Sequence, residues 1–443
     1  MITQRSATVI RLLLSFGVVI LSLEMQAQKT DKNDLDSLNR SNDSLSRYNI
    51  DYWGSISPGK GFEVAKTKFG TLNISGYMLF RWVDQTPPTQ TYQDHLGNSQ
   101  VTDGRNDIIW HRVQAFLTGW VYHPKLNYNI TFWTVNATNQ VAIAGNMSCR
   151  FNKYINISAG INSLGGTRSL QGSHPYWLGS DRVMADEYFR TGFTSAIWVT
   201  GEPLNTLHYF VTVGQNLSEL GIAAGKFNRK LGYGASLYWL PTTNEFGPRG
   251  AYGDWESHDK LATRFGTSFA HHREDRYNNL TQNSPDNTSI RISDATLLFA
   301  GGAVAPGVTV QEANYTLWSF DGGLKYRGLF LQGEYYRRTL SKFAADGALP
   351  LNSIFDHGFM LQVAGFPIRK KLELYGATSQ IFGSFNNSHE WLVGANFFPL
   401  KTRNVRLNGQ VIFVNRSPVS SVFGYYTGGQ TGTTYSAFAS ILF

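Results

Sequence analysis

The chain ends in the stretch 434–443, TYSAFASILF, and the alternation of its side chains decides the fold. Every second residue from Tyr435 to Phe443 is apolar, while polar Ser436 and Ser440 lie on the other face. A period of two belongs to a β-strand, because successive side chains of a strand point to opposite faces. The apolar face extends roughly 26 Å along such a strand, or about 20 Å after tilt, close to the ~25 Å apolar band of a transmembrane barrel. The stretch therefore predicts a membrane-spanning strand.

The same alternation recurs along the chain from about residue 62. Apolar faces that often end in Trp, Tyr or Phe oppose faces of Asn, Gln, Ser, Thr and single Arg residues. Clear examples are 72–82, 112–121, 231–239, 318–325 and 405–413. A secreted β-sandwich or β-helix is the alternative, but its polar face would carry many Lys and Glu side chains. The pattern predicts an all-β, transmembrane antiparallel β-barrel whose apolar faces contact outer-membrane lipid and lipopolysaccharide.

The composition of the 443 residues excludes several other classes of protein. Charged residues are only 16% of the chain, against about 25% in soluble proteins, and Gly (44 residues) and aromatics (14%) are frequent. This mixture does not fit a helical membrane bundle, a coiled coil or a charged disordered chain. Cys149 is the single cysteine, and the net charge of +8 is spread out. We therefore predict no disulfide, no metal or other cofactor, and no nucleic-acid partner.

The N-terminus has the pattern of an export signal. Arg5 and Arg11 precede a short apolar run, and Ala27 supplies a small residue for cleavage. An anchoring helix is the alternative, but a span needs about 20 apolar residues. We predict a signal peptide over 1–27, a polar periplasmic tail over 28–60, and a barrel over 61–443 in the outer membrane of a Gram-negative cell.

Short and long connections alternate between the predicted strands. The short turns are 123–127, 201–205, 326–328, 367–371 and 399–404, and the long loops are 84–106, 164–191, 241–259, 273–312, 341–353 and 415–431. Outer-membrane barrels combine tight periplasmic turns with long external loops. At roughly 25 residues for each strand and its connection, we expect about 16 strands, with 18 as the alternative. A barrel of this size leaves an aqueous channel.

Several segments resemble the phosphate-selective porin O/P family of Gram-negative outer membranes. The resemblance covers most of the mature chain, and its segments are 108–119, 239–248, 260–266, 333–336 and the closing strand. It implies a trimeric, 16-stranded porin whose basic constriction favours anions such as phosphate. The lysine cluster of the family has no counterpart on the predicted inward faces. The resemblance therefore leaves open whether the solute is phosphate, polyphosphate or another small anion.

The predicted inward faces carry isolated basic side chains that suit an anion path. The candidate pore-lining anion contacts are Arg81, Arg112, Arg264, Lys325, Arg338 and Arg406, opposed by Asp321, Glu334 and Glu373. Rings or ladders of Arg and Lys favour anions, and the planar guanidinium can hold an oxyanion through two hydrogen bonds. The alternative is that each Arg pairs with a neighbouring acid and only supports the wall.

The stretch 164–191 is the best candidate for a loop that folds into the barrel. Gly165 and Gly166 let the chain turn back, and Pro175, Tyr176 and Trp177 can anchor it on the wall. Arg168, Arg182 and Arg190 are the candidate constriction residues, opposed by Asp181, Asp186 and Glu187. The alternative is an external loop packed on its neighbours, and 241–259 is a second candidate for the constriction.

These features predict a porin for passive diffusion, with a water-filled, anion-preferring channel. A general, non-selective porin is the nearest alternative. A surface barrel that binds a partner through its long loops is another. An outer-membrane enzyme would need a nucleophile signature beside a histidine, and none is present in the sequence. We therefore predict that the chain is not an enzyme.

Overall fold

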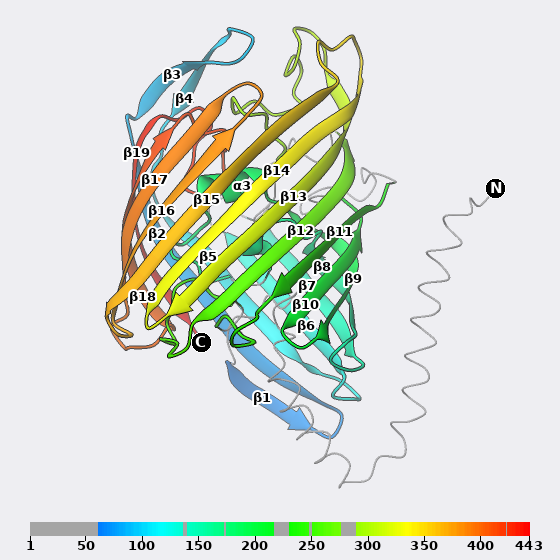
Figure 1. Ribbon diagram of the computed structural model, residues 1–443, viewed down its shortest axis with the longest axis vertical. Helices are drawn as coiled ribbons and strands as arrows, with labels where there is room; N and C mark the ends of the chain where they lie inside the picture. The colour runs from blue at the N-terminus through cyan, green and yellow to red at the C-terminus, as the bar shows by residue number, and fades with distance from the viewer. Residues whose placement is uncertain are drawn as a thin grey trace, which may run out of the picture.

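A computed structural model describes residues 61–135, 140–171, 174–216, 230–247, 250–275, 289–421 and 423–443. The predicted signal peptide (1–27) and periplasmic tail (28–60) lie outside the described residues. Within the described part, sixteen antiparallel strands close into a barrel (Figure 1). No helix in that part is long and apolar enough to cross a membrane.

The barrel strands follow one another around the wall in chain order. They are β2 (Gly70–Thr86), β5 (Asn106–Trp120), β6 (Leu126–Val135), β7 (Gln140–Arg150), β8 (Asn156–Ser163), β9 (Phe193–Leu204), β10 (Leu207–Gly214), β11 (Gly232–Trp239), β12 (Ala262–Asp275), β13 (Val310–Tyr326), β14 (Leu329–Ala345), β15 (Ser353–Ile368), β16 (Leu372–Phe382), β17 (Asn387–Phe397), β18 (Val405–Asn415) and β19 (Gly432–Leu442). The closing strand β19 pairs with β2, where Ala439 lies opposite Phe80. The prediction of a closed, sixteen-stranded barrel is confirmed.

Three strands lie outside this ring. The short strand β1 (Phe62–Thr67) pairs with the start of β2, where β19 has ended. Strands β3 (Thr89–Gln93) and β4 (Ser99–Asp103) form a hairpin at the opposite end of the barrel (Figure 1). Because each barrel strand pairs on both sides, the wall has no free edge.

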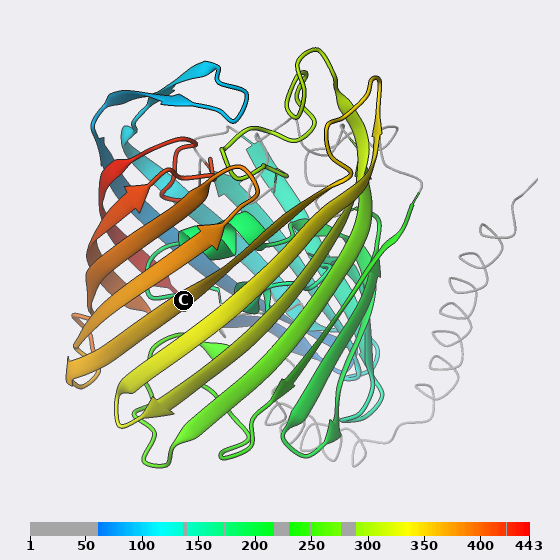
Figure 2. The same cartoon turned by 45° about the horizontal axis from the view of Figure 1, so that its top comes forward.

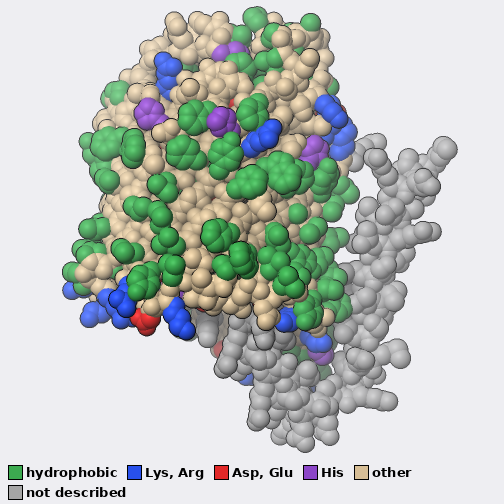
Figure 3. Space-filling view, viewed as in Figure 1, with side chains coloured by type: hydrophobic (Ala, Val, Ile, Leu, Met, Phe, Trp, Pro, Cys, Tyr) green, Lys and Arg blue, Asp and Glu red, His purple; other side chains and the backbone are tan. Residues whose placement is uncertain are grey.

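The two faces of the wall differ as the sequence pattern predicts. Trp318, Phe320 and Trp391 point outward and are 43%, 50% and 56% exposed. Figure 3 shows hydrophobic side chains spread over the outer wall, with Lys and Arg towards its two ends. The residues between them, such as Ser319, are buried inside. Apolar side chains outward and polar ones inward are the arrangement of a transmembrane barrel.

The short predicted turns all lie at one end of the barrel, together with its C-terminus. The 241–259 connection lies at this end too, so its prediction as an external loop is wrong. The reason is a connection that the sequence pattern does not reveal, between Gly214 at the end of β10 and Gly232 at the start of β11. Successive connections alternate between the two ends of the barrel. Overlooking the connection between β10 and β11 therefore assigns the 241–259 connection to the wrong end.

Candidate functional site

The connection between β8 and β9, residues 164–192, folds into the barrel, and we call it the internal loop. It contains the short helices η3 (Arg168–Leu170) and α3 (Met184–Phe189), which lie within the ring of strands (Figure 2). Its entry bends at Gly165 and Gly166, whose φ angles are +85° and +124°. These angles suit glycine and are strained for other residues. The predicted inward-folded loop is therefore present.

Small residues of the wall make room for the start of the internal loop. A Cβ atom on Gly234 of β11 would lie 1.6 Å from the carbonyl oxygen of Leu164, and one on Gly232 would lie 2.7 Å from its side chain. Leu164 itself is completely buried. The glycines on the inner face of β11 thus allow the backbone of the loop to lie directly against the wall.

Arginines of the wall hold the rest of the internal loop. Arg112 donates hydrogen bonds to the Ser180 carbonyl (2.7 Å) and the Asp181 carboxylate (2.9 Å). Arg406 donates to the Trp177 carbonyl at 2.6 Å. A guanidinium has five donors in a rigid plane, so one arginine can bind several loop oxygens at once. These contacts fix the position of the loop across the lumen.

A second arginine cluster holds the α3 end of the loop. Arg338 forms an ion pair with Asp356 at 2.6 Å and hydrogen-bonds to the Tyr188 hydroxyl. The ring of Phe189 stacks on Tyr336, with ring centres 5.2 Å apart. Both charged side chains of the ion pair are almost completely buried. The contacts of Arg338 and the stacking of Phe189 on Tyr336 therefore both anchor α3 to the wall at β14.

The three arginines predicted to line the constriction are all buried within or against the internal loop. Arg190 pairs with Glu187 at 2.7 Å, and Arg182 lies 3.7 Å from the same carboxylate. Arg168 donates its backbone N–H to Glu334 at 2.8 Å and its side chain to the Gly250 carbonyl. The loop thus carries its own acidic partners. Contact of these arginines with a solute stays a prediction.

Two further connections enter the lumen. The 416–431 loop comes from the long-loop end, and Arg81 donates to its Phe423 and Gly424 carbonyls at 2.8 and 3.1 Å. The 240–261 segment comes from the short-turn end, and its Tyr252 N–H donates to the Tyr176 carbonyl at 2.8 Å. The lumen is therefore filled from both ends, with the internal loop between the two.

All six predicted pore-lining residues point inward and are buried. They differ in their partners. Arg112, Arg264 and Arg338 contact the carboxylates of Asp181, Asp321 and Asp356, whereas Arg81, Lys325 and Arg406 donate to backbone carbonyls. A carbonyl satisfies the donor without neutralising the cation. Arg81 and Arg406 therefore leave positive charge in the wall.

The inner wall carries more acidic side chains than the alternation in the sequence predicts. Besides Asp321, Glu334 and Glu373, the inner face also carries Asp356 of β15 and Glu390 of β17, both fully buried. Glu390 accepts hydrogen bonds from Tyr426 (2.6 Å) and from the backbone of Met184 (2.6 Å). The inner faces of β15 and β17 mix apolar and acidic residues, so the two carboxylates carry no clear pattern in the sequence.

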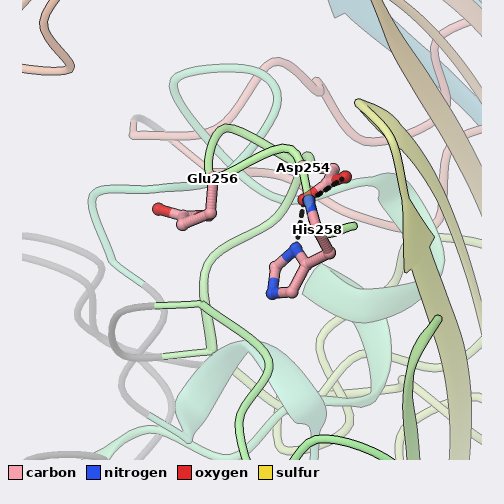
Figure 4. Close-up of side chains that lie close together, drawn as sticks. All are labelled: Asp254, Glu256 and His258. Atoms are coloured by element: carbon pink, nitrogen blue, oxygen red, sulfur yellow. Dashed lines mark hydrogen bonds and ion pairs between the residues drawn. The ribbon is translucent and has the colours of Figure 1, made fainter. Parts of the chain in front are cut away.

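The 240–261 segment contains a histidine between two carboxylates. His258 contacts Asp254 through Nδ1, and its Nε2 lies 2.5 Å from Glu245. Figure 4 shows the Asp254 contact, with the side chain of Glu256 set apart from it. Asp254, Glu256 and His258 place ligand atoms within 4.8 Å of one another, as a metal site would. However, both ring nitrogens already contact carboxylates, so the arrangement is that of an ion-paired imidazolium.

This histidine makes the position of the 240–261 segment sensitive to pH. The hydrogen bonds to Asp254 and Glu245 raise the pKa of His258 to about 9. Burial alone raises the pKa values of the two carboxyls, but the contact with His258 leaves them below their ordinary values. The contribution of His258 is complete below its ordinary pKa of about 6.5 and is lost as the pH rises through about 9. The carboxyls contribute above about pH 4.5, and their contribution is lost as the pH falls further.

We expect hydrogen–deuterium exchange to detect this loss. Protection of residues 250–258, corrected for the intrinsic exchange rate, falls between pH 6.5 and pH 10. In His258→Gln, protection is already low at pH 6.5 and changes little at higher pH. His123→Gln, in the turn between β5 and β6, is the matched control and leaves the segment unchanged. A pH profile of His258→Gln that equals the original one would contradict the assignment.

Two pockets lie inside the barrel beside the internal loop. The mouth pocket, at the short-turn end, includes Tyr176, Phe366 and Arg403 in its lining. The central pocket is lined by residues that include Arg182 and Tyr375. Trp177 and Tyr252 line both pockets. These two rings therefore stand between the two spaces.

Comparison with known proteins gives likenesses in structure alone. No protein-family model and no curated protein sequence matches the chain. The barrel is similar to an outer-membrane-expressed OmpT of Vibrio cholerae (TM-score 0.51, 11% identity), covering 86% of this chain and 100% of that one. It is similar to OmpF of Salmonella typhi in complex with daunomycin (0.51, 12%, 86% and 100%) and to an anion-selective porin from Comamonas acidovorans (0.50, 11%, 84% and 100%). At these identities the likeness shows the fold, which is that of Gram-negative outer-membrane porins.

Proposed function

We propose that the chain is an outer-membrane porin that lets small solutes diffuse passively and prefers anions. The observation that carries the proposal is the closed sixteen-stranded barrel with an apolar outer face, a polar and charged inner face, and a loop folded across its lumen. A barrel of this size has room for an aqueous path, and an inward loop narrows it. Diffusion through it requires no enzymatic chemistry and no cofactor.

The anion preference is supported by the partners of the inward cations. Among the described residues, Arg81 and Arg406 donate to backbone carbonyls and form no ion pair with a carboxylate. A guanidinium keeps its charge at every physiological pH, whereas a buried carboxyl can be neutralised by a proton. The electrostatic potential inside the barrel is therefore expected to be positive, and a positive potential concentrates anions.

The reversal potential in a KCl gradient tests the preference. We expect chloride to carry more current than potassium, and Arg81→Gln to lower the chloride-to-potassium permeability ratio roughly twofold, since one fixed charge is removed from the path. Arg416→Gln, an exposed residue at the end of β18, is the control and keeps the original ratio. A potassium-selective current would contradict the proposed preference.

A general, non-selective porin is the second candidate, and a specific observation favours it. The six inward basic side chains face seven buried acidic ones on the described inner wall, since Glu202 of β9 and Glu274 of β12 add to the five named above, and the net charge of the wall is therefore close to neutral. A reversal potential near zero would support this candidate. The family resemblance supports a more specific proposal, in which the solute is phosphate or polyphosphate. Block of the chloride current by added phosphate would test it.

Assembly and surroundings are part of the same proposal. The exposed apolar outer wall fits outer-membrane lipid and lipopolysaccharide, and we propose a homotrimer with the family that the chain resembles. Chemical cross-linking of the protein in its membrane should then give a trimer as the largest abundant species. A monomer under the same conditions would contradict the proposed assembly.

A further inference from the structure

We propose that the outer wall at strands β13–β15 binds a phosphate group of lipid A, the membrane anchor of lipopolysaccharide, and that Arg337 is the main contact. The inference rests on the proposed function, since it gives the lipopolysaccharide around the proposed outer-membrane porin a defined site on the wall. This site lies on the outside of the barrel and is separate from the path through the lumen.

Arg337 lies where the outer wall changes from apolar to polar. From Leu329 to Tyr335 the outward side chains of β14 are Leu, Leu, Gly and Tyr, and Arg337 comes next. On β13, Trp318 lies opposite Arg337, and Thr316 follows it towards the long-loop end. The stretch from Leu329 to Arg337 covers roughly 26 Å along the strand, or about 20 Å after tilt, close to the ~25 Å apolar band of a transmembrane barrel. Arg337 is therefore at the level where lipid headgroups begin.

Arg337 forms no hydrogen bond and no ion pair with the described part of the chain. Its side chain is exposed, and its guanidinium carbon lies 5.2 Å from the centre of the Phe355 ring on β15. His357 lies opposite Arg337 in the register of β14 and β15 and stacks on Phe355, with ring centres 5.7 Å apart. A guanidinium over a ring keeps the N–H groups at its edge available, so Arg337 can bind two oxygens of one phosphate. The imidazole of His357 stands beside it as a further donor.

Further cations lie on the same face towards the long-loop end. Glu312 of β13 accepts hydrogen bonds from both Lys230 and Arg273 at 2.7 Å, so two cations share one carboxylate. Figure 3 shows Lys, Arg and His side chains towards this end of the outer wall. The charged side chains of β12–β14 that are not buried are Arg273, Arg337 and Lys342 against Asp275 and Glu312, and Lys230 adds a fourth cation. The excess of positive charge attracts an anionic headgroup.

The level and the charge of the site favour lipid A over a phospholipid. In the proposed orientation the long loops face the outside, and the outer leaflet of a Gram-negative outer membrane is made of lipopolysaccharide. A phosphate monoester of lipid A carries between one and two negative charges and three terminal oxygens. The phosphate of a phospholipid is a diester with a single charge. The monoester is therefore the stronger partner for a guanidinium.

Native mass spectrometry of the folded protein in detergent tests binding without depending on conduction. We expect lipid A to bind about tenfold more tightly than lipid A from which the phosphates have been removed, because the charged hydrogen bonds to Arg337 are then lost. Phosphatidylglycerol should also bind less tightly than lipid A. Equal affinities for the two forms of lipid A would overturn the phosphate site, and equal affinities for lipid A and phosphatidylglycerol would overturn the choice of lipid A.

Variants at the two ends of the same strand pair locate the site. Arg337→Gln should weaken binding of lipid A about tenfold and leave binding of the dephosphorylated form unchanged, which also shows that the variant is folded. Arg337→Lys keeps the charge without the planar fork and should lie between the two. Arg327→Gln is the matched control, because Arg327 is exposed at the short-turn end and lies over the Tyr326 ring at 5.0 Å. If Arg337→Gln and Arg327→Gln bind lipid A equally, the site is wrong.

The binding measurement also separates this inference from the proposed function. Current through a planar bilayer without preference for phosphorylated lipid A would leave the porin standing and remove the lipid site. Preferential binding of lipid A through Arg337 without any current would keep the site and remove the channel.

Discussion

Removal of the internal loop is expected to raise the single-channel conductance at least about twofold, since the loop occupies the lumen of a barrel wide enough for an aqueous channel. The deletion spans residues 167–190 and joins Gly166 to Thr191 through two glycines. The ends of the loop already lie together, because the Thr191 hydroxyl donates to the Gly165 carbonyl at 2.6 Å. Planar-bilayer recordings of single channels measure the change.

The barrel should tolerate this deletion. Arg112, Arg338 and Arg406 lose their partners in the loop, but the water that replaces it hydrates the freed guanidinium groups. Deletion of the β3–β4 hairpin, at the long-loop end of the barrel, is the matched control and leaves the conductance unchanged. If the variant without the loop inserts as a folded barrel and keeps the original conductance, the loop does not limit the flow of ions.

Arg338→Ala is expected to lower the free energy of unfolding by about 3–5 kcal/mol, as is usual when one partner of a buried ion pair is removed. The substitution leaves Asp356 buried without its cation and removes the hydrogen bond to the Tyr188 hydroxyl. Urea titration of the protein folded in lipid vesicles measures the change.

The neighbouring arginine provides the control. Arg337 lies on the same strand and points to the outside, so Arg337→Ala should change the stability by less than about 1 kcal/mol. Adding Asp356→Asn to Arg338→Ala should recover part of the loss, because the unpaired buried charge is then gone. Equal effects of Arg338→Ala and Arg337→Ala would contradict the inward assignment of Arg338.

The wall of the barrel can be predicted from the sequence because it follows from a local rule. In β18 and β19 successive side chains point alternately out of and into the barrel, so apolar and polar residues alternate along the sequence. The entry to the internal loop is also visible, since Gly165 and Gly166 mark a sharp turn of the backbone. Neither prediction needs information about distant parts of the chain.

The inside of the barrel follows no such rule. Arg406 binds the Trp177 carbonyl, although the two residues are 229 positions apart. The sequence around either residue does not indicate this contact. The apolar side chains of α3 belong to the same buried cluster as the inward Leu340 and Ile354, so polar side chains are not required where the loop covers the wall. The alternation that predicts the outer face is therefore lost on parts of the inner face.

A register shift makes another part of the inner face impossible to predict from the alternation. The pairing of β2 with β5 shifts between Leu79 and Phe80, and both His111 and Arg112 are buried as a result. Strict alternation places only one of two successive residues inside. The inward position of His111, whose Nε2 lies 2.6 Å from the Phe423 carbonyl, could not be found from the period of two.

Single-channel recording with the purified, folded protein in a planar bilayer is the first test of the proposed porin. We expect stepwise currents that grow linearly with voltage in KCl, because the path through the lumen is aqueous and passive. A folded barrel that inserts into the bilayer, as protection from added protease shows, and yet gives no steps would contradict it.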